Sequence, residues 1–199
     1  MFILGTANFG QKYNGSELNK KECFKVLEEY KKLGGVYIDT AFNYGKAQDI
    51  IGEFGADQFK INTKVWSINE FNISLETLKI DKLYSCMARD INTIDDLKYI
   101  RMNKQIEKWG VTIYYPHELR GDANITFIPF IDYFLKYLPV MLLHGDVWIR
   151  SFWNIGYRSY AWNDFLDKNR NDIGHNIYMV CGVSDIYQLR NNMEFFNAQ

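Results

Sequence analysis

The sequence predicts one α/β domain over residues 1–199, a compact (β/α)8 barrel of the TIM type with some helices shortened or missing. Eight short apolar runs recur along the chain, and their near-continuous apolarity indicates strands buried on both faces, as in parallel sheets. Segments of helical period lie between several of these runs, and this alternation is typical of α/β barrels. Because 199 residues are close to the lower limit for that fold, some helices must be short. An open α/β sheet is the structural alternative.

The eight predicted strands are rich in β-branched and aromatic residues, and most are followed by a polar turn. In chain order they occupy residues 2–7, 35–40, 59–66, 82–88, 110–115, 125–130, 146–152 and 177–183. The connections after the third, fifth and sixth strands are short or poorly helical. We therefore expect one or more of the helices after those strands to be absent or reduced.

Four segments show a helical period. Ser16 opens the first, which the glycines at 34 and 35 end, and its apolar face comprises Leu18, Cys23, Val26, Leu27 and Tyr30. The second covers residues 95–109, with Ile106 and Trp109 on its buried face. The other two cover residues 162–167 and 186–196.

Composition excludes several classes of function. The net charge of −1 and the pI of about 6.3 give no basic excess for nucleic acid. The cysteines, Cys23, Cys86 and Cys181, have no metal-ligand spacing, and we interpret them as buried reduced thiols. No apolar run is long enough to span a membrane, and the amino-terminal residues do not resemble a signal peptide, so we expect a cytoplasmic protein. The sequence makes no prediction of oligomeric state.

Polar side chains stand at the ends of several predicted strands, where functional groups of a parallel barrel gather. Asp39 ends the second run, Tyr44 follows in its loop, and Lys64 lies near the end of the third. A nearby ammonium stabilises a phenolate and lowers the pKa of a tyrosine from about 10. A carboxylate partner keeps a buried lysine charged. The three residues form a candidate acid–base site with Tyr44 as the proton carrier, whereas the alternative is a turn-capping aspartate and a solvent-facing lysine.

Several segments resemble the aldo-keto reductases. "GTANFGQKY", "IDTAFNYGKAQDIIGEF" and "INTKV" are similar to the family's glycine-rich first strand, its D-T-A-x-x-Y-G motif and its T-K-V third strand. Later segments resemble it in order: "IEKWGVTIYYPHEL", "ITFIPF", "WIRSFWNIG" and "VCGVSDIYQLRNN". The resemblance implies hydride transfer from a nicotinamide cofactor to the carbonyl of a small or sugar-like substrate. It also implies that Asp39, Tyr44 and Lys64 are catalytic, with Tyr44 giving the proton.

The resemblance further implies a site for NADP or NAD. The positions that match are Gly5, Thr6, Thr112, Arg150, Ser151, Gly182, Ser184 and Asn192. Thr112 is expected near the carboxamide, and Ser184 and Asn192 at the adenosine end. Other positions depart from the family: Ile113, Phe127 and Ile131 replace amide side chains, and Gly182 and Gln188 stand where many members have basic residues for the 2′-phosphate. Arg190 lies nearby and is a candidate substitute.

The fourth catalytic position of the family is a histidine at the end of strand four. In this chain the best register places Arg89 there, a slip by one places Ala88 there, and no histidine of the chain lies at that strand end. A permanent cation there could polarise a carbonyl or bind an anionic group, or it could pair with a surface aspartate. Three hypotheses follow: a reductase, a non-redox acid–base enzyme in which Arg89 binds an anionic group, and an inactive binding protein. Retention of Asp39, Tyr44 and Lys64 favours an enzyme.

Overall fold

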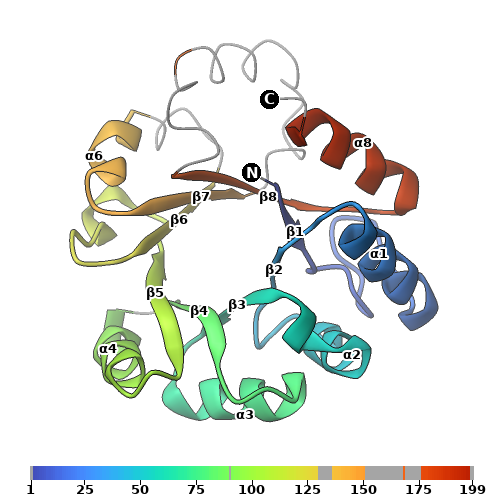
Figure 1. The fold of residues 1–199 in the computed structure, drawn as a ribbon. Coiled ribbons are helices and arrows are strands. Elements are labelled where there is room, and N and C mark those ends of the chain that lie inside the picture. Colours follow the sequence, from blue (N-terminus) through green and yellow to red (C-terminus); the bar gives the residue numbers. More distant parts are fainter. Residues whose placement is uncertain (1, 90, 130–135, 151–167, 169–175, 198–199) are drawn as a thin grey trace.

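Eight parallel strands close into a barrel in sequence order, which confirms the predicted fold (Figure 1). The computed structural model of the chain describes residues 2–89, 91–129, 136–150, 168 and 176–197. The strands are β1 Phe2–Gly5, β2 Tyr37–Asp39, β3 Lys60–Val65, β4 Leu83–Ala88, β5 Ile106–Thr112, β6 Ile125–Pro129, β7 Asp146–Arg150 and β8 Ile177–Gly182. β1 pairs with both β2 and β8, so the sheet has no free edge.

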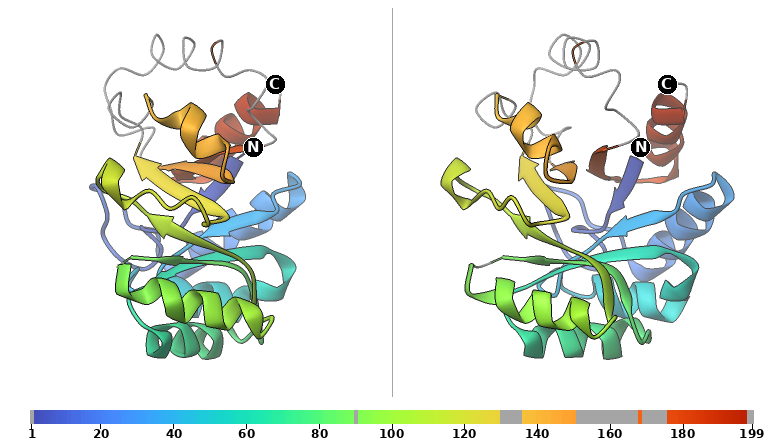
Figure 2. Two further views of the ribbon diagram at one scale, coloured as in Figure 1. Left: turned by 90° about the vertical axis from the view of Figure 1, so that its left-hand side faces the viewer. Right: turned by 60° about the vertical axis from the view of Figure 1, so that its left-hand side comes forward.

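Helices lie around the outside of the barrel, as the three views in Figures 1 and 2 show. They are α1 Lys20–Lys32, α2 Ala47–Phe54, α3 Ile68–Leu78, α4 Ile94–Met102, α6 Leu138–Leu142 and α8 Ile186–Asn197. The connection after β5 holds only the 3-10 turn Pro116–Glu118, and α6 has five residues, as the short connections predicted. The expectation that one or more helices after the third, fifth and sixth strands would be absent or reduced is therefore confirmed. Only the interpretation of the connection after the third strand as short or poorly helical is wrong, because it holds the 11-residue helix α3. Ser67 caps α3 by accepting a hydrogen bond from the Glu70 backbone, and Phe71 and Leu78 bury its inner face.

Two predicted helix boundaries are also wrong. The second helix ends at Met102, and Ile106 and Trp109 lie in β5. Residues three apart in a strand point to opposite faces, but both are buried here, so their spacing imitates a helical period. A left-handed residue, Lys104 with φ 61°, separates helix from strand. The first helix begins at Lys20 after an Asn19 cap, because Asn19 and Glu22 form a reciprocal capping box. The helix predicted over residues 162–167 lies outside the described residues.

Aromatic and aliphatic side chains fill the barrel interior. Ile3, Met87, Ile125, Phe127, Trp148, Tyr178 and Val180 form this inner cluster. Tyr37 and Tyr84 pack edge to face near the amino-terminal ends of the strands, with ring centroids 5.2 Å apart. Filling at that end leaves the carboxyl-terminal ends of the strands as the place for a site.

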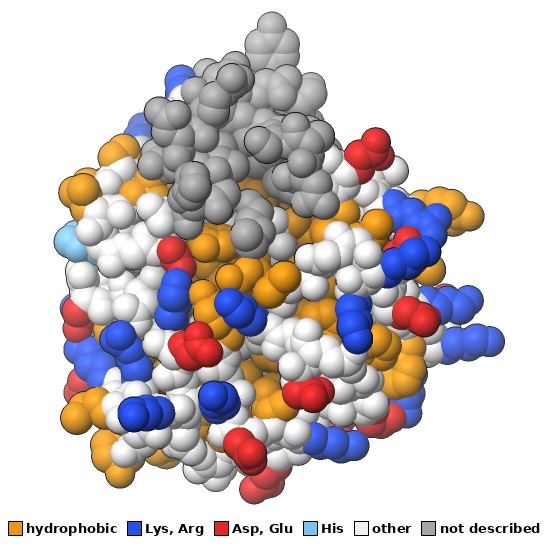
Figure 3. Space-filling view, in the orientation of Figure 1, with side chains coloured by type: hydrophobic (Ala, Val, Ile, Leu, Met, Phe, Trp, Pro, Cys, Tyr) orange, Lys and Arg blue, Asp and Glu red, His pale blue; other side chains and the backbone are white. Residues whose placement is uncertain are grey.

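The cysteines and the charged surface side chains lie as expected from the composition. Cys23, Cys86 and Cys181 are buried free thiols, as predicted. Acidic and basic side chains are interspersed on the face seen in Figure 3. Over the described part of the chain, no helix has the length and apolarity needed to cross a membrane. The same part contains no cluster of three or more side chains suited to hold a metal ion.

Candidate active site

A buried ion pair joins the ends of β2 and β3. The Lys64 Nζ donates to both carboxylate oxygens of Asp39 at 2.6 Å and to the Thr40 carbonyl at 2.9 Å. Both side chains are almost completely buried, with exposed fractions of 1% and 3%. Burial lowers the pKa of Lys64, and the Asp39 carboxylate opposes that shift. The pair therefore places a positive charge inside the barrel beside a matched negative charge.

Two polar side chains that sequence reasoning missed support this pair. Asn62 Nδ2 donates to Asp39 Oδ1 at 2.7 Å, and Ser85 Oγ donates to Asn62 Oδ1 at 2.8 Å. Asn62 and Ser85 are fully buried and interrupt apolar strands. Such an inward polar residue is a detectable signal, since buried polar groups require partners. The chain of hydrogen bonds holds the carboxylate of Asp39 in one orientation.

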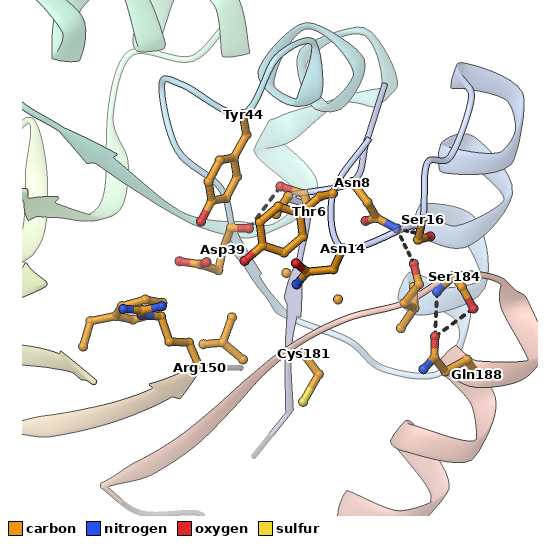
Figure 4. A pocket seen from close by; sticks show the side chains of 17 residues that line it. Thr6, Asn8, Asn14, Ser16, Asp39, Tyr44, Arg150, Cys181, Ser184 and Gln188 are labelled. Carbon is orange, nitrogen blue, oxygen red and sulfur yellow. Dashed lines mark hydrogen bonds between the residues drawn. The ribbon is translucent and has the colours of Figure 1, made fainter. Parts of the chain in front are cut away.

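Tyr44 is placed by a tight turn after β2. Its backbone N–H donates to the Ala41 carbonyl at 3.0 Å, and Gly45 takes φ 50° two residues before the start of α2. Figure 4 shows the phenol of Tyr44 directed toward the Asp39 carboxylate. The Lys64 Nζ lies 5.1 Å from the centroid of the Tyr44 ring, which is a cation–π distance. The structure thus brings together the three residues that the sequence singled out.

The expected lowering of the Tyr44 pKa is wrong. Burial of the phenol raises its pKa, and the negative charge of Asp39 raises it further. Arg89 and Arg150 oppose this shift with their positive charges. In this conformation Tyr44 is therefore a neutral phenol, the form that donates a proton.

Arg89 follows β4 and reaches Tyr44 and Trp66. Its backbone N–H donates to the Val65 carbonyl at 3.0 Å, which continues the strand pairing. Its guanidinium carbon lies 4.7 Å from the Trp66 ring centroid and 5.9 Å from that of Tyr44. Among the described residues no carboxylate pairs with it, and Asn43 Oδ1 accepts from Nη2 at 3.3 Å. Arg89 is thus directed toward the Tyr44 side of the barrel end.

A cavity of about 300 Å³ opens beside Asp39 and Tyr44. Five of the predicted cofactor residues line it: Gly5, Thr6, Arg150, Gly182 and Ser184. The loop after β1 also contributes Asn8, Tyr13, Asn14 and Ser16, which sequence reasoning did not assign to the site. Thr112 and Asn192 are buried outside the cavity lining, and Ser151 lies outside the described residues. The cavity therefore connects the Asp39–Lys64 pair to the amino-terminal end of α8 (Figure 4).

The comparisons with known proteins agree with this geometry. The model of the aldo/keto reductase family matches residues 2–105, more than half of the chain. The chain belongs to the aldo/keto reductase family. Residues 2–105 contain Asp39, Tyr44, Lys64 and Arg89. No curated protein matches the sequence.

Solved structures of aldo-keto reductases share the fold at low identity. A Pseudomonas aeruginosa protein described as an aldo-keto reductase is 15% identical, with a TM-score of 0.79 over 99% of this chain and 89% of that one. A thermostable aldo-keto reductase solved with the inhibitor epalrestat is 15% identical, with a TM-score of 0.75 over 100% and 89%. Aldose reductase from Giardia lamblia is 11% identical, with a TM-score of 0.72 over 100% and 87%.

Buried polar atoms without a hydrogen-bond partner indicate whether this aldo/keto reductase could hold a nicotinamide cofactor. Thr112 Oγ1, Arg150 Nε and Asn192 Nδ2 are buried and have no hydrogen-bond partner among the residues that the structure describes. Buried polar atoms of this kind need a partner, which a polar ligand supplies. All three belong to the set predicted for the cofactor. Arg150 also lines the cavity, and its unpaired Nε fits a polar group of a cofactor bound there.

At the start of α8, two backbone N–H groups that could bind a phosphate already have acceptors. The backbone N–H of Ser184 donates to Gln188 Oε1 at 2.6 Å, and that of Gln188 donates to Asp185 Oδ1 at 2.8 Å. Arg190, the candidate substitute for the missing basic residues, pairs with Glu29 of α1 at 2.7 Å. Side chains of this aldo/keto reductase therefore already satisfy the N–H groups of Ser184 and Gln188, and one of these side chains is acidic.

Proposed function

We propose that this chain is an NAD(P)H-dependent oxidoreductase that reduces the carbonyl of a small or sugar-like substrate, with Tyr44 as the proton donor. The observation that carries the proposal is the buried Asp39–Lys64 pair against the Tyr44 ring, beside a cavity. A neutral phenol next to buried positive charge can give up a proton as charge develops on a carbonyl oxygen.

Each residue has a distinct part in this mechanism. Tyr44 donates its proton to the carbonyl oxygen and becomes a phenolate. The ammonium of Lys64, 5.1 Å from the ring centroid, and the guanidinium of Arg89, at 5.9 Å, stabilise that negative charge. Asp39 keeps Lys64 charged and in place. A bound nicotinamide cofactor supplies the hydride, and Thr6, Arg150 and Ser184 in the cavity, together with Thr112 and Asn192, would hold it.

Binding is the first test. NADH and NADPH are titrated separately against the protein by fluorescence, and the expected result is a saturable signal with at least one of them. The absence of saturation up to about millimolar concentration, where binding free energy is only about −4 kcal/mol, would refute the reductase proposal. That result would favour the non-redox hypothesis, in which Tyr44 acts as an acid or base without a cofactor.

The second test removes one hydroxyl. Tyr44→Phe keeps the ring and its packing, so a proton donor should lose about 10²- to 10⁴-fold in kcat on a panel of aldehydes, ketones and sugars. Tyr99→Phe on α4, whose ring is 62% exposed, is the matched control and should leave kcat unchanged. An unchanged kcat in Tyr44→Phe would show that another group donates the proton.

A further inference from the structure

Arg89 is a cation without a counter-charge in the described part of the chain. Lys64 and Lys108, two other partly or fully buried cations of the barrel, each pair with a carboxylate at 2.6 Å. Arg89 instead rests on the face of Trp66, and within the described ranges its side chain donates one hydrogen bond, to the uncharged amide of Asn43. Its Nε is buried and has no acceptor among the described residues. A guanidinium held by an aromatic face and left without an anion is arranged to bind one.

The position of Arg89 separates it from the cavity. In the closed order of strands, β4 lies across the barrel from β8. The cavity is lined by residues of β1, β2, β6, β7 and β8 and of the loops that follow β1, β2 and β8, and Arg89 is not among them. Tyr44 lies between the two, since it lines the cavity and its ring centroid is 5.9 Å from the guanidinium carbon of Arg89. The 5.9 Å between the Arg89 guanidinium carbon and the Tyr44 ring centroid places a cation beside the group that would meet a carbonyl. Arg89 therefore faces the substrate side of Tyr44 if the cofactor takes the cavity.

We infer that the substrate is an anionic carbonyl compound whose carboxylate or phosphate group is bound by Arg89. This inference rests on the proposed function, because it takes Tyr44 as the group that meets the carbonyl. Arg89 has a planar fork of donors that matches two oxygens of either anion. Trp66 and Asn43 hold the guanidinium in place before binding, which reduces the entropy lost on binding.

Matched pairs of substrates test the inference. Succinic semialdehyde is compared with butanal for a carboxylate, and glyceraldehyde 3-phosphate with glyceraldehyde for a phosphate. We expect the wild type to favour the anionic member of at least one pair in kcat/KM by about 10- to 100-fold, the range of one or two charge-assisted hydrogen bonds. The pair that shows the preference identifies the anion.

Variants assign the preference to Arg89. Arg89→Gln should reduce the anionic-to-neutral ratio of kcat/KM by at least about tenfold, and Arg89→Lys should retain part of it, because charge remains without the fork. Arg101→Gln on the exposed side of α4 is the matched control and should leave the ratio unchanged. Urea unfolding of each variant checks that the fold is kept. Turnover with no preference, or with a ratio that Arg89→Gln does not change, overturns the inference and leaves the proposed function standing.

A measurement of anion binding tests the inference separately from the proposed function. If no carbonyl is turned over, succinate and glycerol 3-phosphate are titrated by calorimetry. Binding of either by the wild type, lost in Arg89→Gln and kept in Arg101→Gln, supports the anion site although the reductase assignment has failed. No binding by the wild type overturns the inference as well.

Discussion

Replacing Asp39 by asparagine leaves the Lys64 ammonium buried without an anion. The carboxylate accepts from Lys64 on both oxygens and from Asn62 on one. An asparagine has one acceptor oxygen, so its NH₂ group must face Lys64 or Asn62, where only donors meet it. Removing one member of a buried ion pair typically costs about 3–5 kcal/mol in unfolding free energy. With exposed fractions of 1% and 3%, this pair should lie in that range.

The reverse change and the double variant complete the cycle. Lys64→Met removes the cation and leaves Asp39 with Asn62 as its side-chain donor, and it should cost a similar amount. The double variant Asp39→Asn/Lys64→Met has no buried charge left, so its loss should be clearly smaller than the sum of the two single losses. Urea unfolding followed by tryptophan fluorescence measures each free energy.

An exposed pair provides the control for burial. Lys98 and Asp122 are also 2.6 Å apart, but their side chains are 42% and 57% exposed. The cycle of Lys98→Met and Asp122→Asn should give a coupling of no more than about 1 kcal/mol. If Asp39→Asn costs as little as a change in this exposed pair, burial does not decide the strength of the Asp39–Lys64 interaction, and the reasoning is refuted.

Three further predictions concern pH, cofactor choice and packing. Because burial and Asp39 raise the Tyr44 pKa, the rate of carbonyl reduction should stay flat between about pH 7 and pH 9. The rate of alcohol oxidation, which needs the phenolate, should rise about tenfold per pH unit over the same range. A pH–rate profile in which reduction declines over this range contradicts the assignment of Tyr44 as proton donor. NADH should bind at least as tightly as NADPH in fluorescence titrations, because the Asp185 carboxylate caps the start of α8. Asp185→Asn should shift the ratio of the two dissociation constants in favour of NADPH. Tenfold tighter binding of NADPH than of NADH by the wild type would contradict this prediction. Gly110→Ala should lower the free energy of unfolding in urea by about 1–3 kcal/mol, since the added Cβ would lie 2.6 Å from the Ile125 carbonyl oxygen. Gly182→Ala should cost less, because its Cβ would lie 3.7 Å from the nearest atom, the Gly5 carbonyl oxygen. Equal losses of free energy in the two variants would count against close packing at Gly110.

Part of the site could be predicted from the sequence because a parallel barrel brings all strand ends to one place. Asp39 and Lys64 stand at the ends of apolar runs, and closing the barrel puts their side-chain atoms 2.6 Å apart. Asn62 and Ser85 escaped prediction because a single polar residue inside a strand does not show which neighbour it will meet. The loop residues Tyr13 and Asn14 escaped because their place over the cavity depends on a turn between β1 and α1.

The sequence by itself determined the order and number of the strands, the buried thiols and the residue types at the barrel end. These properties follow from the local period of apolar residues, which the chain carries without reference to distant segments. Only the tertiary structure decided the charge state of Tyr44, the direction of Arg89 and the pairing of Arg190 with Glu29, 161 positions away in the chain. Desolvation and charge pairing depend on distances between segments that are remote in sequence, so local pattern could indicate an acid–base site but gave the wrong sign for its pKa shift.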